Sequence, residues 1–187
     1  MQDRSLNLAL EAGQLLPTHV CWRVNDGYLR AIAHTKLNEL FTLGIWGPGD
    51  FVDLQPLSQG SVELRALSTA RVQEQQLNPN EASSLCIAQI QQMADLLQIA
   101  SIRPVDARLM SLLTWLSKRF GRESSNGYMM PLNQMNLTHR QIAEMTGMSR
   151  VTVTKGLSQF RQKKYLEIIS GEEILTQIGL DWLESLS

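Results

Sequence analysis

Hydroxyl and cationic side chains gather in the stretch 138–155, which places Arg140, Arg150 and Lys155 among threonines and serines. Hydroxyl, guanidinium and ammonium groups donate hydrogen bonds to phosphate oxygens, and arginine also pairs with base edges in the DNA major groove. The chemistry open to this stretch is therefore the binding of nucleic acid.

Capping residues in the same stretch predict two short helices joined by a tight turn. Thr138 can accept hydrogen bonds from the free N–H groups at the start of the first helix, and Gln141 stands where a capping box has Glu or Gln. Gly147 can adopt the left-handed conformation that ends a helix. Ser149 then caps the second helix.

Packing residues of these helices indicate a helix-turn-helix. Ala143 is small enough for a second helix to cross closely, and Val153 would hold that helix on the first. In a helix-turn-helix the second helix enters the major groove, so the chain is predicted to be a transcription regulator that binds double-stranded DNA. Its first turns present outward Arg150, Val151, Thr154 and Lys155.

The outward residues have separate expected roles. Arg150 is the candidate for a bidentate bond to guanine O6 and N7, worth roughly 1–3 kcal/mol of discrimination. Val151 offers only methyl contacts, which suit thymine, and Lys155 reaches a base edge or a phosphate. The groups expected to bind phosphate or position the backbone are Thr138, His139, Arg140, Ser149 and Thr152 or Thr154.

Gly156 does not fit helix propensity, because a glycine inside a helix costs about 1 kcal/mol relative to alanine. Close packing of a neighbouring element at this position is the expected reason.

Charge is concentrated near the predicted helices. The whole chain of 187 residues carries a net charge of −1, so it is not a polycation. After Gly171 the balance becomes acidic. A basic patch in a near-neutral protein fits a DNA-contacting face, and a solvated helix face is the alternative. Against Glu144 alone, the segment 138–165 has six cations, which are Arg140, Arg150, Lys155, Arg161, Lys163 and Lys164.

The N-terminal part has the pattern of a β domain. The runs 20–24 and 29–33 flank Asn25-Asp26-Gly27 and predict a hairpin. Short strands separated by Gly/Pro turns such as 47–50 favour a jelly roll or small barrel. Further strands are expected at 41–46, 51–54, 62–67 and 69–75.

From Asn78-Pro79 the pattern changes to that of a long helix. Spacings of four and three residues separate its apolar positions, as in the seam of a coiled coil. One interpretation of this seam is that the helix packs on the β domain of the same chain. Pairing with a second chain is favoured, because the opposite face of the helix is polar, with Gln89, Gln92, Asp95 and Gln98. The expected interface of this homodimer is Cys86, Ile90, Met93, Leu97 and Ala100.

The C-terminal part is predicted to be a winged helix-turn-helix. Pro104 separates the long helix from a helix over 104–120, after which 121–126 is expected to be a loop and 128–131 a short strand. A hairpin over 166–169 and 172–176 forms the wing. The fold class is therefore α+β, divided into a β-roll (1–77), a dimerisation helix with hinge (78–103) and a winged helix-turn-helix (104–187).

This order of parts resembles the CRP/FNR family of regulators. The most specific match runs from Arg140 to Leu157, and the segment 150–155 is similar to the recognition helix of cyanobacterial nitrogen-control members. The resemblance implies a homodimer on an inverted-repeat DNA site, with RNA polymerase as a candidate partner. Two glycine turns, Asn25–Gly27 and Gly47–Phe51, and the helix entry at Asn78-Pro79 also match.

The resemblance fails in the segment that binds cyclic nucleotides in that family. The matching regions, 51–57 and 59–63, supply no cation, while Asp53 and Glu63 would repel a phosphate. Val151 stands where nucleotide-dependent relatives have glutamate. The protein is therefore expected not to depend on cyclic AMP, and its effector is unknown. Arg65 alternates with Leu64 and is expected to be structural or to face solvent.

Residue types argue against the other functions considered. Cys21 and Cys86 are expected to be buried free thiols, and two isolated cysteines cannot hold an iron–sulfur cluster. His19 and His34 are isolated, which disfavours haem and a cupin-like metalloenzyme. No catalytic set stands out, so we expect no enzyme, no metal and no cofactor. A winged helix that binds protein rather than DNA is the remaining alternative.

No secretory signal or membrane-length apolar run is evident. A cytoplasmic protein without a membrane partner is expected.

Overall fold

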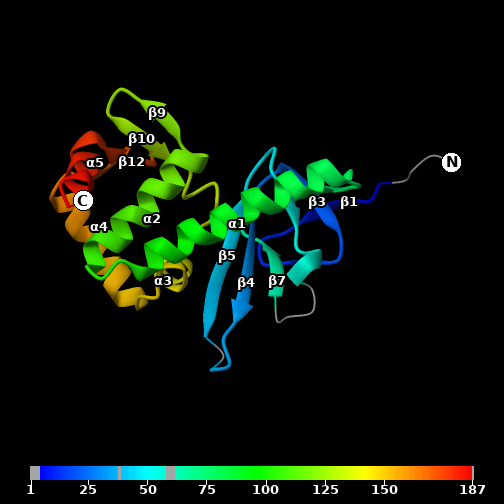
Figure 1. Ribbon diagram of the computed structural model, residues 1–187. Helices are drawn as coiled ribbons and strands as arrows, with labels where there is room; N and C mark the ends of the chain where they lie inside the picture. The colour runs from blue at the N-terminus through cyan, green and yellow to red at the C-terminus, as the bar shows by residue number, and fades with distance from the viewer. Residues whose placement is uncertain (1–4, 38, 58–61, 187) are drawn as a thin grey trace. The chain divides into compact units, whose positions relative to one another are not determined.

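The computed structural model describes residues 5–37, 39–57 and 62–186 (Figure 1). The chain divides into two compact units, 1–96 and 97–187.

Two four-stranded antiparallel sheets form the first unit, as expected for a β-roll. Their strand orders are β1-β8-β3-β6 and β2-β7-β4-β5. Apolar residues of both sheets, including Trp22, Leu29, Trp46 and Leu64, form its core. The strands are β1 (Asn7–Leu10), β2 (Leu15–Leu16), β3 (Cys21–Asp26), β4 (Leu29–His34), β5 (Leu40–Trp46), β6 (Phe51–Asp53), β7 (Val62–Ala66) and β8 (Ala70–Gln75), with a 3-10 turn, η1 (Gln55–Leu57), after β6.

The hairpin predicted around Asn25-Asp26-Gly27 is wrong. β3 pairs with β6 and β8, whereas β4 pairs with β5 and β7, so the two strands belong to different sheets. Gly27 has a φ of +76°, and a Cβ on it would collide with the Thr69 carbonyl. The turn therefore takes the chain closely past the start of β8 into the second sheet. The other predicted strands are confirmed as β5 to β8.

Helix α1 (Pro79–Ser101) attaches to the roll through buried glutamines. The Gln89 amide accepts a hydrogen bond from the Asp53 N–H and donates one to the Asp53 carbonyl, both at 2.8 Å. The Gln92 amide accepts from the Ile45 N–H at 2.6 Å. Two of the four polar residues predicted on this face, Gln89 and Gln92, thus form hydrogen bonds with the backbones of β6 and β5.

The apolar stripe of α1 is largely open to solvent in the single chain. Ile90 is 60% and Leu97 69% exposed, and Cys86 is exposed, while Met93 and Ala100 are half-buried. The helix therefore packs on the roll through its glutamines rather than through the stripe.

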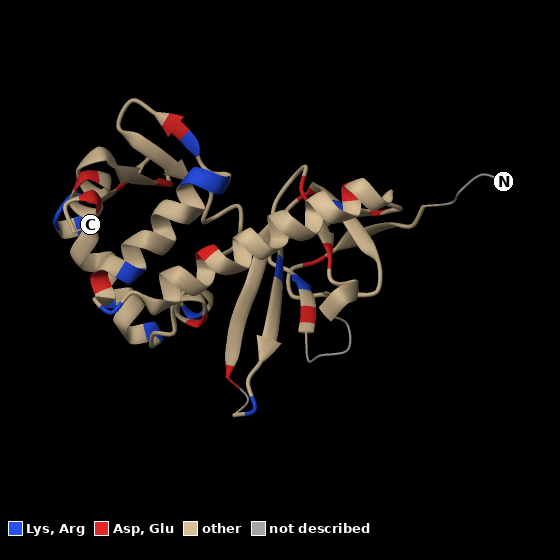
Figure 2. Cartoon of the chain, viewed as in Figure 1, with Lys and Arg blue, Asp and Glu red and all other residues tan. Residues whose placement is uncertain are grey.

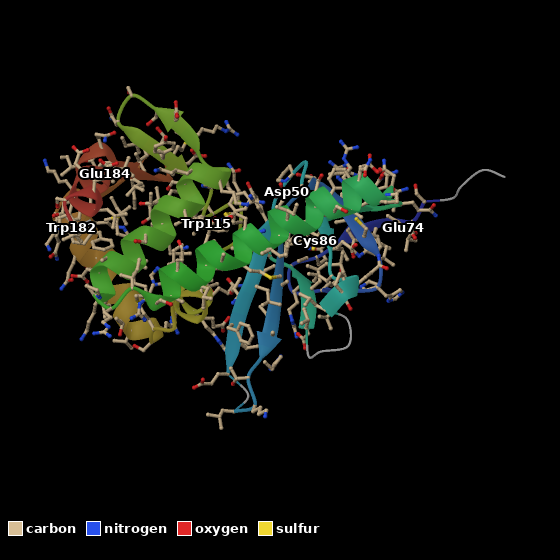
Figure 3. All side chains as sticks on the ribbon, viewed as in Figure 1. Asp50, Glu74, Cys86, Trp115, Trp182 and Glu184 are labelled. Carbon is tan, nitrogen blue, oxygen red and sulfur yellow. The ribbon has the colours of Figure 1, made fainter. Side chains whose placement is uncertain are left out.

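The prediction of buried thiols holds for Cys21 and is wrong for Cys86. Both cysteines are free. Burial, with a smaller contribution from Asp53, raises the pKa of the Cys21 thiol to about 12. Cys86 is exposed because its helical position belongs to the open stripe of α1 (Figure 3).

The second unit is a winged helix built on a four-stranded sheet of order β11-β12-β10-β9. The prediction of a loop at 121–126 is wrong in part, because Arg122–Ser124 forms a strand that pairs with β10. Its elements are α2 (Val105–Phe120), β9 (Arg122–Ser124), β10 (Gly127–Met130), α3 (His139–Thr146), α4 (Arg150–Gln162), β11 (Leu166–Ile169), β12 (Glu172–Thr176) and α5 (Gln177–Glu184).

Aromatic rings close the second unit at its C-terminal end. Tyr165 and Trp182 are stacked with their centroids 5.2 Å apart, and each lies 6.0 Å from Phe160. The Phe160 side chain is buried on α4, so the stack fixes α5 against the end of α4.

Gly156 marks a close approach of α4 to α2. A Cβ on Gly156 would lie 2.7 Å from Cδ2 of Leu109, which is itself 1% exposed. Real side chains do not come this near, so the glycine lets the two helices meet. The close packing expected from the sequence is confirmed.

A double-mutant cycle tests this crossing. Gly156→Ala must displace Leu109 in the wild-type chain, whereas in a Leu109→Ala background the space left by the leucine accepts the new methyl group. We expect a favourable coupling of about 1 kcal/mol in the free energy of unfolding, measured by urea denaturation of the single and double variants. Additive effects would contradict the close approach.

Candidate nucleic-acid interface

Helix α3 begins with the predicted capping box. The Thr138 hydroxyl accepts from the Gln141 N–H at 3.2 Å, and the Gln141 amide oxygen accepts from the Thr138 N–H at 2.8 Å. Gly147 ends the helix in the left-handed region with φ 63°, and its N–H donates to the Ala143 carbonyl. Both ends of α3 are thus fixed by local hydrogen bonds.

Helix α4 begins at the predicted cap, Ser149. Its hydroxyl oxygen accepts from the Thr152 N–H at 3.1 Å, and the hydroxyls of the two residues lie 2.8 Å apart. One free N–H of the helix start is therefore already satisfied inside the protein.

The two helices cross through small and apolar side chains. Val153 is fully buried and Ala143 is 5% exposed, as predicted. The remaining buried residues of α4 are Gly156, Leu157 and Phe160.

The opposite face of α4 is open. Arg150, Thr154 and Lys155 are exposed, and Val151 is 62% exposed. Among the described residues, neither Arg150 nor Lys155 takes part in an ion pair. The exposed face of α4 therefore carries two cations without ion-pair partners beside an exposed valine, and the opposite face of the helix is buried in the protein.

A hydrogen bond links the starts of the two helices. Nδ1 of His139 lies 2.9 Å from the hydroxyl of Thr154, which donates to the Arg150 carbonyl at 2.9 Å. The structure thus brings together two residues that were singled out separately in the sequence. Arg140 is 77% exposed and pairs with Glu144 at 3.2 Å, one helical turn away.

The basic patch is smaller than the sequence indicates (Figure 2). Arg161 forms an ion pair with Glu173 of β12, a contact that the sequence did not reveal because the wing turns back over α4. The Lys163 ammonium lies 5.8 Å from the centre of the Tyr165 ring. Arg161 is therefore neutralised, whereas Lys163 and Lys164 stay exposed at the end of α4 and, among the described residues, form no ion pair.

Sequence reasoning also missed a structural role of Arg108 on α2. Its guanidinium donates to the Ile102 carbonyl at 2.6 Å and to the Thr146 carbonyl at 3.0 Å. Arg108 thereby joins the segment before α2 to the last turn of α3. A single arginine on a helix face gives no sequence pattern for such a contact.

In the roll, the acidic residues that disfavoured cyclic nucleotides have protein partners. Glu63 pairs with Arg65 at 2.6 Å and lies 3.7 Å from Nε2 of His34. Most of the second region that matches the nucleotide-binding segment of the family, 59–63, lies outside the described residues. Within the part of the chain that is described, no group of three or more His, Cys, Asp or Glu side chains is placed to hold a metal ion.

In the described ranges, no helix combines the length and the apolar character that crossing a membrane requires.

Comparison with known proteins gives matches over both units. The model of the Crp-like helix-turn-helix domain matches residues 107–185. Regulatory protein CysR of Synechococcus elongatus is 34% identical over 151 residues, which are 79% of this chain and 73% of that protein. The global nitrogen regulator of a Nostoc species is 33% identical over 112 residues, 57% of this chain and 48% of the relative.

A solved structure shows the same fold over nearly the whole chain. The CRP/FNR-family transcriptional regulator from Thermus thermophilus superimposes with a TM-score of 0.70 and covers 97% of both chains at 19% identity. The expected α+β fold, with a roll, a long helix and a winged helix-turn-helix, is confirmed.

Removing the cap of α4 tests how the exposed face is held. Ser149→Ala deletes the oxygen that accepts from the Thr152 N–H, and we expect the free energy of unfolding to fall by about 1 kcal/mol in chemical denaturation. Ser158→Ala, on the exposed side of the same helix, is the matched control and should be neutral or slightly stabilising. Equal changes in the two variants would show that Ser149 is not a cap.

Proposed function

Because the chain belongs to the CRP/FNR family of transcription regulators, we propose that it binds specific DNA sequences by placing α4 in the major groove. The open face of α4 is the observation that carries this proposal. This face carries Arg150 and Lys155, neither of which is in an ion pair, together with the exposed Val151, and the other face of the helix is buried.

Specific contacts follow from the chemistry of this face. Arg150 pairs with guanine O6 and N7, and Val151 contacts a thymine methyl group. The half-site therefore contains a guanine with neighbouring T·A pairs, similar to the GTA half-sites of nitrogen-control relatives. Lys155 reaches a base edge or a phosphate.

Phosphate contacts come from the starts of both helices. Thr138, His139 and Arg140 stand at the start of α3, and Ser149 with Thr152 or Thr154 at the start of α4. Hydroxyl groups and helix N-termini are common phosphate ligands, and they set the register on the duplex without reading its sequence.

A homodimer supplies the second recognition helix. Its interface is the stripe Cys86, Ile90, Met93, Leu97 and Ala100, most of which is open in the single chain. Apolar residues at heptad spacing favour association with an identical helix. Two copies of α4 about 34 Å apart then bind an inverted repeat.

The remaining parts of the proposal concern the effector of the roll, the domain boundaries, the cellular location and the contact with RNA polymerase. Glu63 neutralises Arg65, which supports a regulator that does not depend on cyclic AMP. We keep the division into roll (1–77), dimerisation helix with hinge (78–103) and winged helix-turn-helix (104–187). A cytoplasmic location and contact with RNA polymerase belong to the same proposal.

Binding of protein through the winged helix is the second candidate, and the wing favours it. Ile168 is 61% and Ile169 38% exposed at the wing, and Glu172 lies opposite Ile169 in the hairpin register. Such a surface suits a protein better than a phosphate backbone. The salt dependence of duplex binding separates the two, because DNA affinity falls steeply as salt rises.

Substitution of Arg150 tests base reading. We expect Arg150→Ala to lose the preference for guanine in a selection of bound duplexes from random DNA, and to retain weak, salt-sensitive binding. The expected loss on the selected site is roughly 1–3 kcal/mol. Lys164→Gln is the control, because Lys164 is an exposed cation outside the base-reading face, and loss of its charge should weaken binding to all sequences alike. An unchanged preference in Arg150→Ala would refute base reading by this residue.

Substitution of Leu97 tests the dimer. Leu97→Glu places a carboxylate in the apolar seam, where pairing would bury like charges, so we expect monomers in sedimentation experiments at concentrations where the wild type is dimeric. Ser84→Glu adds the same charge to an exposed position of α1 outside the stripe and should leave the dimer intact. A dimeric Leu97→Glu protein would contradict the interface.

A further inference from the structure

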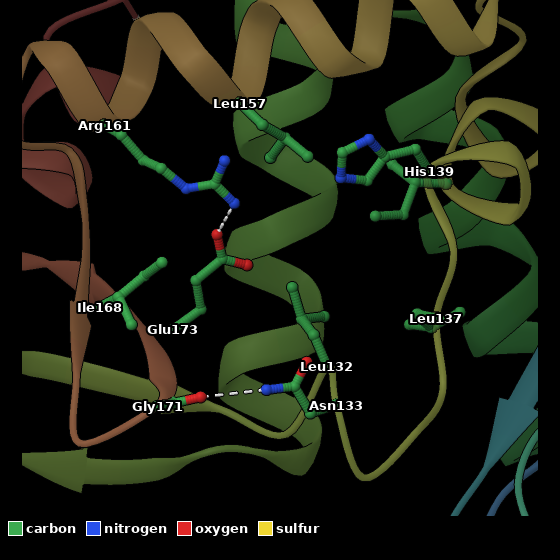
Figure 4. A pocket seen from close by; sticks show the side chains of 10 residues that line it. Leu132, Asn133, Leu137, His139, Leu157, Arg161, Ile168, Gly171 and Glu173 are labelled. Atoms are coloured by element: carbon green, nitrogen blue, oxygen red, sulfur yellow. Dashed lines mark hydrogen bonds and ion pairs between the residues drawn. The ribbon is translucent and has the colours of Figure 1, made fainter.

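A pocket of about 190 Å³ opens between α3, α4 and the wing hairpin β11–β12 (Figure 4). Its floor is aliphatic, because Leu132, Ile142 and Leu157 line it and are at most 7% exposed. The volume is below the roughly 300–1,000 Å³ of pockets for drug-sized ligands, so only a molecule of a few heavy atoms fits. Base reading by α4 does not use this pocket, and of its lining residues only His139 is among the proposed phosphate contacts.

On one wall, His139 presents a hydrogen-bond acceptor. The Thr154 hydroxyl has a single hydrogen, which it donates to the Arg150 carbonyl. The neutral tautomer that satisfies both contacts of this hydroxyl has Nδ1 of His139 as the donor in the 2.9 Å contact. In the neutral ring the proton is then on Nδ1, and Nε2 keeps its lone pair. Figure 4 shows the ring turned so that this edge faces the pocket.

On the opposite wall, Glu173 presents a second acceptor. One of its carboxylate oxygens accepts from Arg161, and the other points into the pocket in Figure 4. The side chain is only 14% exposed. Below it, the Asn133 amide donates through Nδ2 to the Gly171 carbonyl at 3.0 Å, which leaves the amide oxygen as a further acceptor.

We propose that this pocket binds a small aliphatic ammonium ion. Its N–H groups would donate to Glu173 and to Nε2 of His139, and its hydrocarbon part would lie against Leu132 and Leu157. An anion is disfavoured because it would meet the free oxygen of Glu173 and the lone pair of Nε2, while one terminal nitrogen of Arg161 is already bonded to Glu173. The proposal goes beyond DNA binding and does not depend on it.

Methyl NMR of the full chain, with butylammonium chloride as the probe, tests the site. At about pH 8 the probe is protonated, as an alkylammonium group is. We expect saturable shifts of the Leu132, Leu157 and Ile168 methyl signals, referenced to potassium chloride at equal ionic strength. Butan-1-ol, which has the same hydrocarbon part and no charge, should bind about tenfold more weakly.

Two neighbouring glutamates provide matched variants. Glu173→Gln should weaken butylammonium binding about tenfold, whereas Glu172→Gln, which does not line the pocket, should leave it unchanged. Absence of saturable methyl shifts in the wild type would overturn the proposal. Equal binding of butan-1-ol would also overturn it, and that comparison needs no variant to fold.

Discussion

The open face of α4 depends on the burial of its other face. Val153, Gly156, Leu157 and Phe160 fix the helix on α2 and α3, and Gly156 allows an approach that any side chain would prevent. Hydrogen bonds at Thr138 and Ser149 then define where both helices begin. Because the packing of the buried face does not involve Arg150 or Lys155, both side chains can stay solvated and unpaired without loss of core stability. A recognition surface needs this combination, because a charge that the protein already neutralises interacts more weakly with a phosphate or a base.

Local patterns predicted the helix-turn-helix well because its determinants are local. The capping box and Gly147 act within four residues, and Ala143 and Val153 follow helical spacing, so their roles could be inferred without coordinates. The strand pairing around Gly27 was wrong for the opposite reason. A turn sequence indicates that the chain bends, but the partner of each strand is decided by distant residues. The ion pair of Arg161 with Glu173 and the contacts of Arg108 escaped notice for the same reason.

Helix α1 has two faces that serve different neighbours. In the sequence, the polar face is only a reason to expect that the apolar stripe pairs with a second chain, whereas in the structure Gln89 and Gln92 of that face are buried and bond to strand backbones of the roll. Amide side chains can satisfy backbone groups at a sheet edge, which apolar residues cannot do. The apolar stripe is thereby left for another partner. In the proposed dimer the same helix serves both the roll and the second chain, each with a different face.

Methylation interference on a duplex selected by the wild-type protein tests the central claim most directly. Guanine N7 lies in the major groove, where Arg150 is proposed to bind it. The account predicts that N7 methylation of one guanine in each half-site blocks binding, and that the two guanines are related by an inverted repeat. Binding that tolerates methylation of every guanine N7 would show that α4 does not read the major groove.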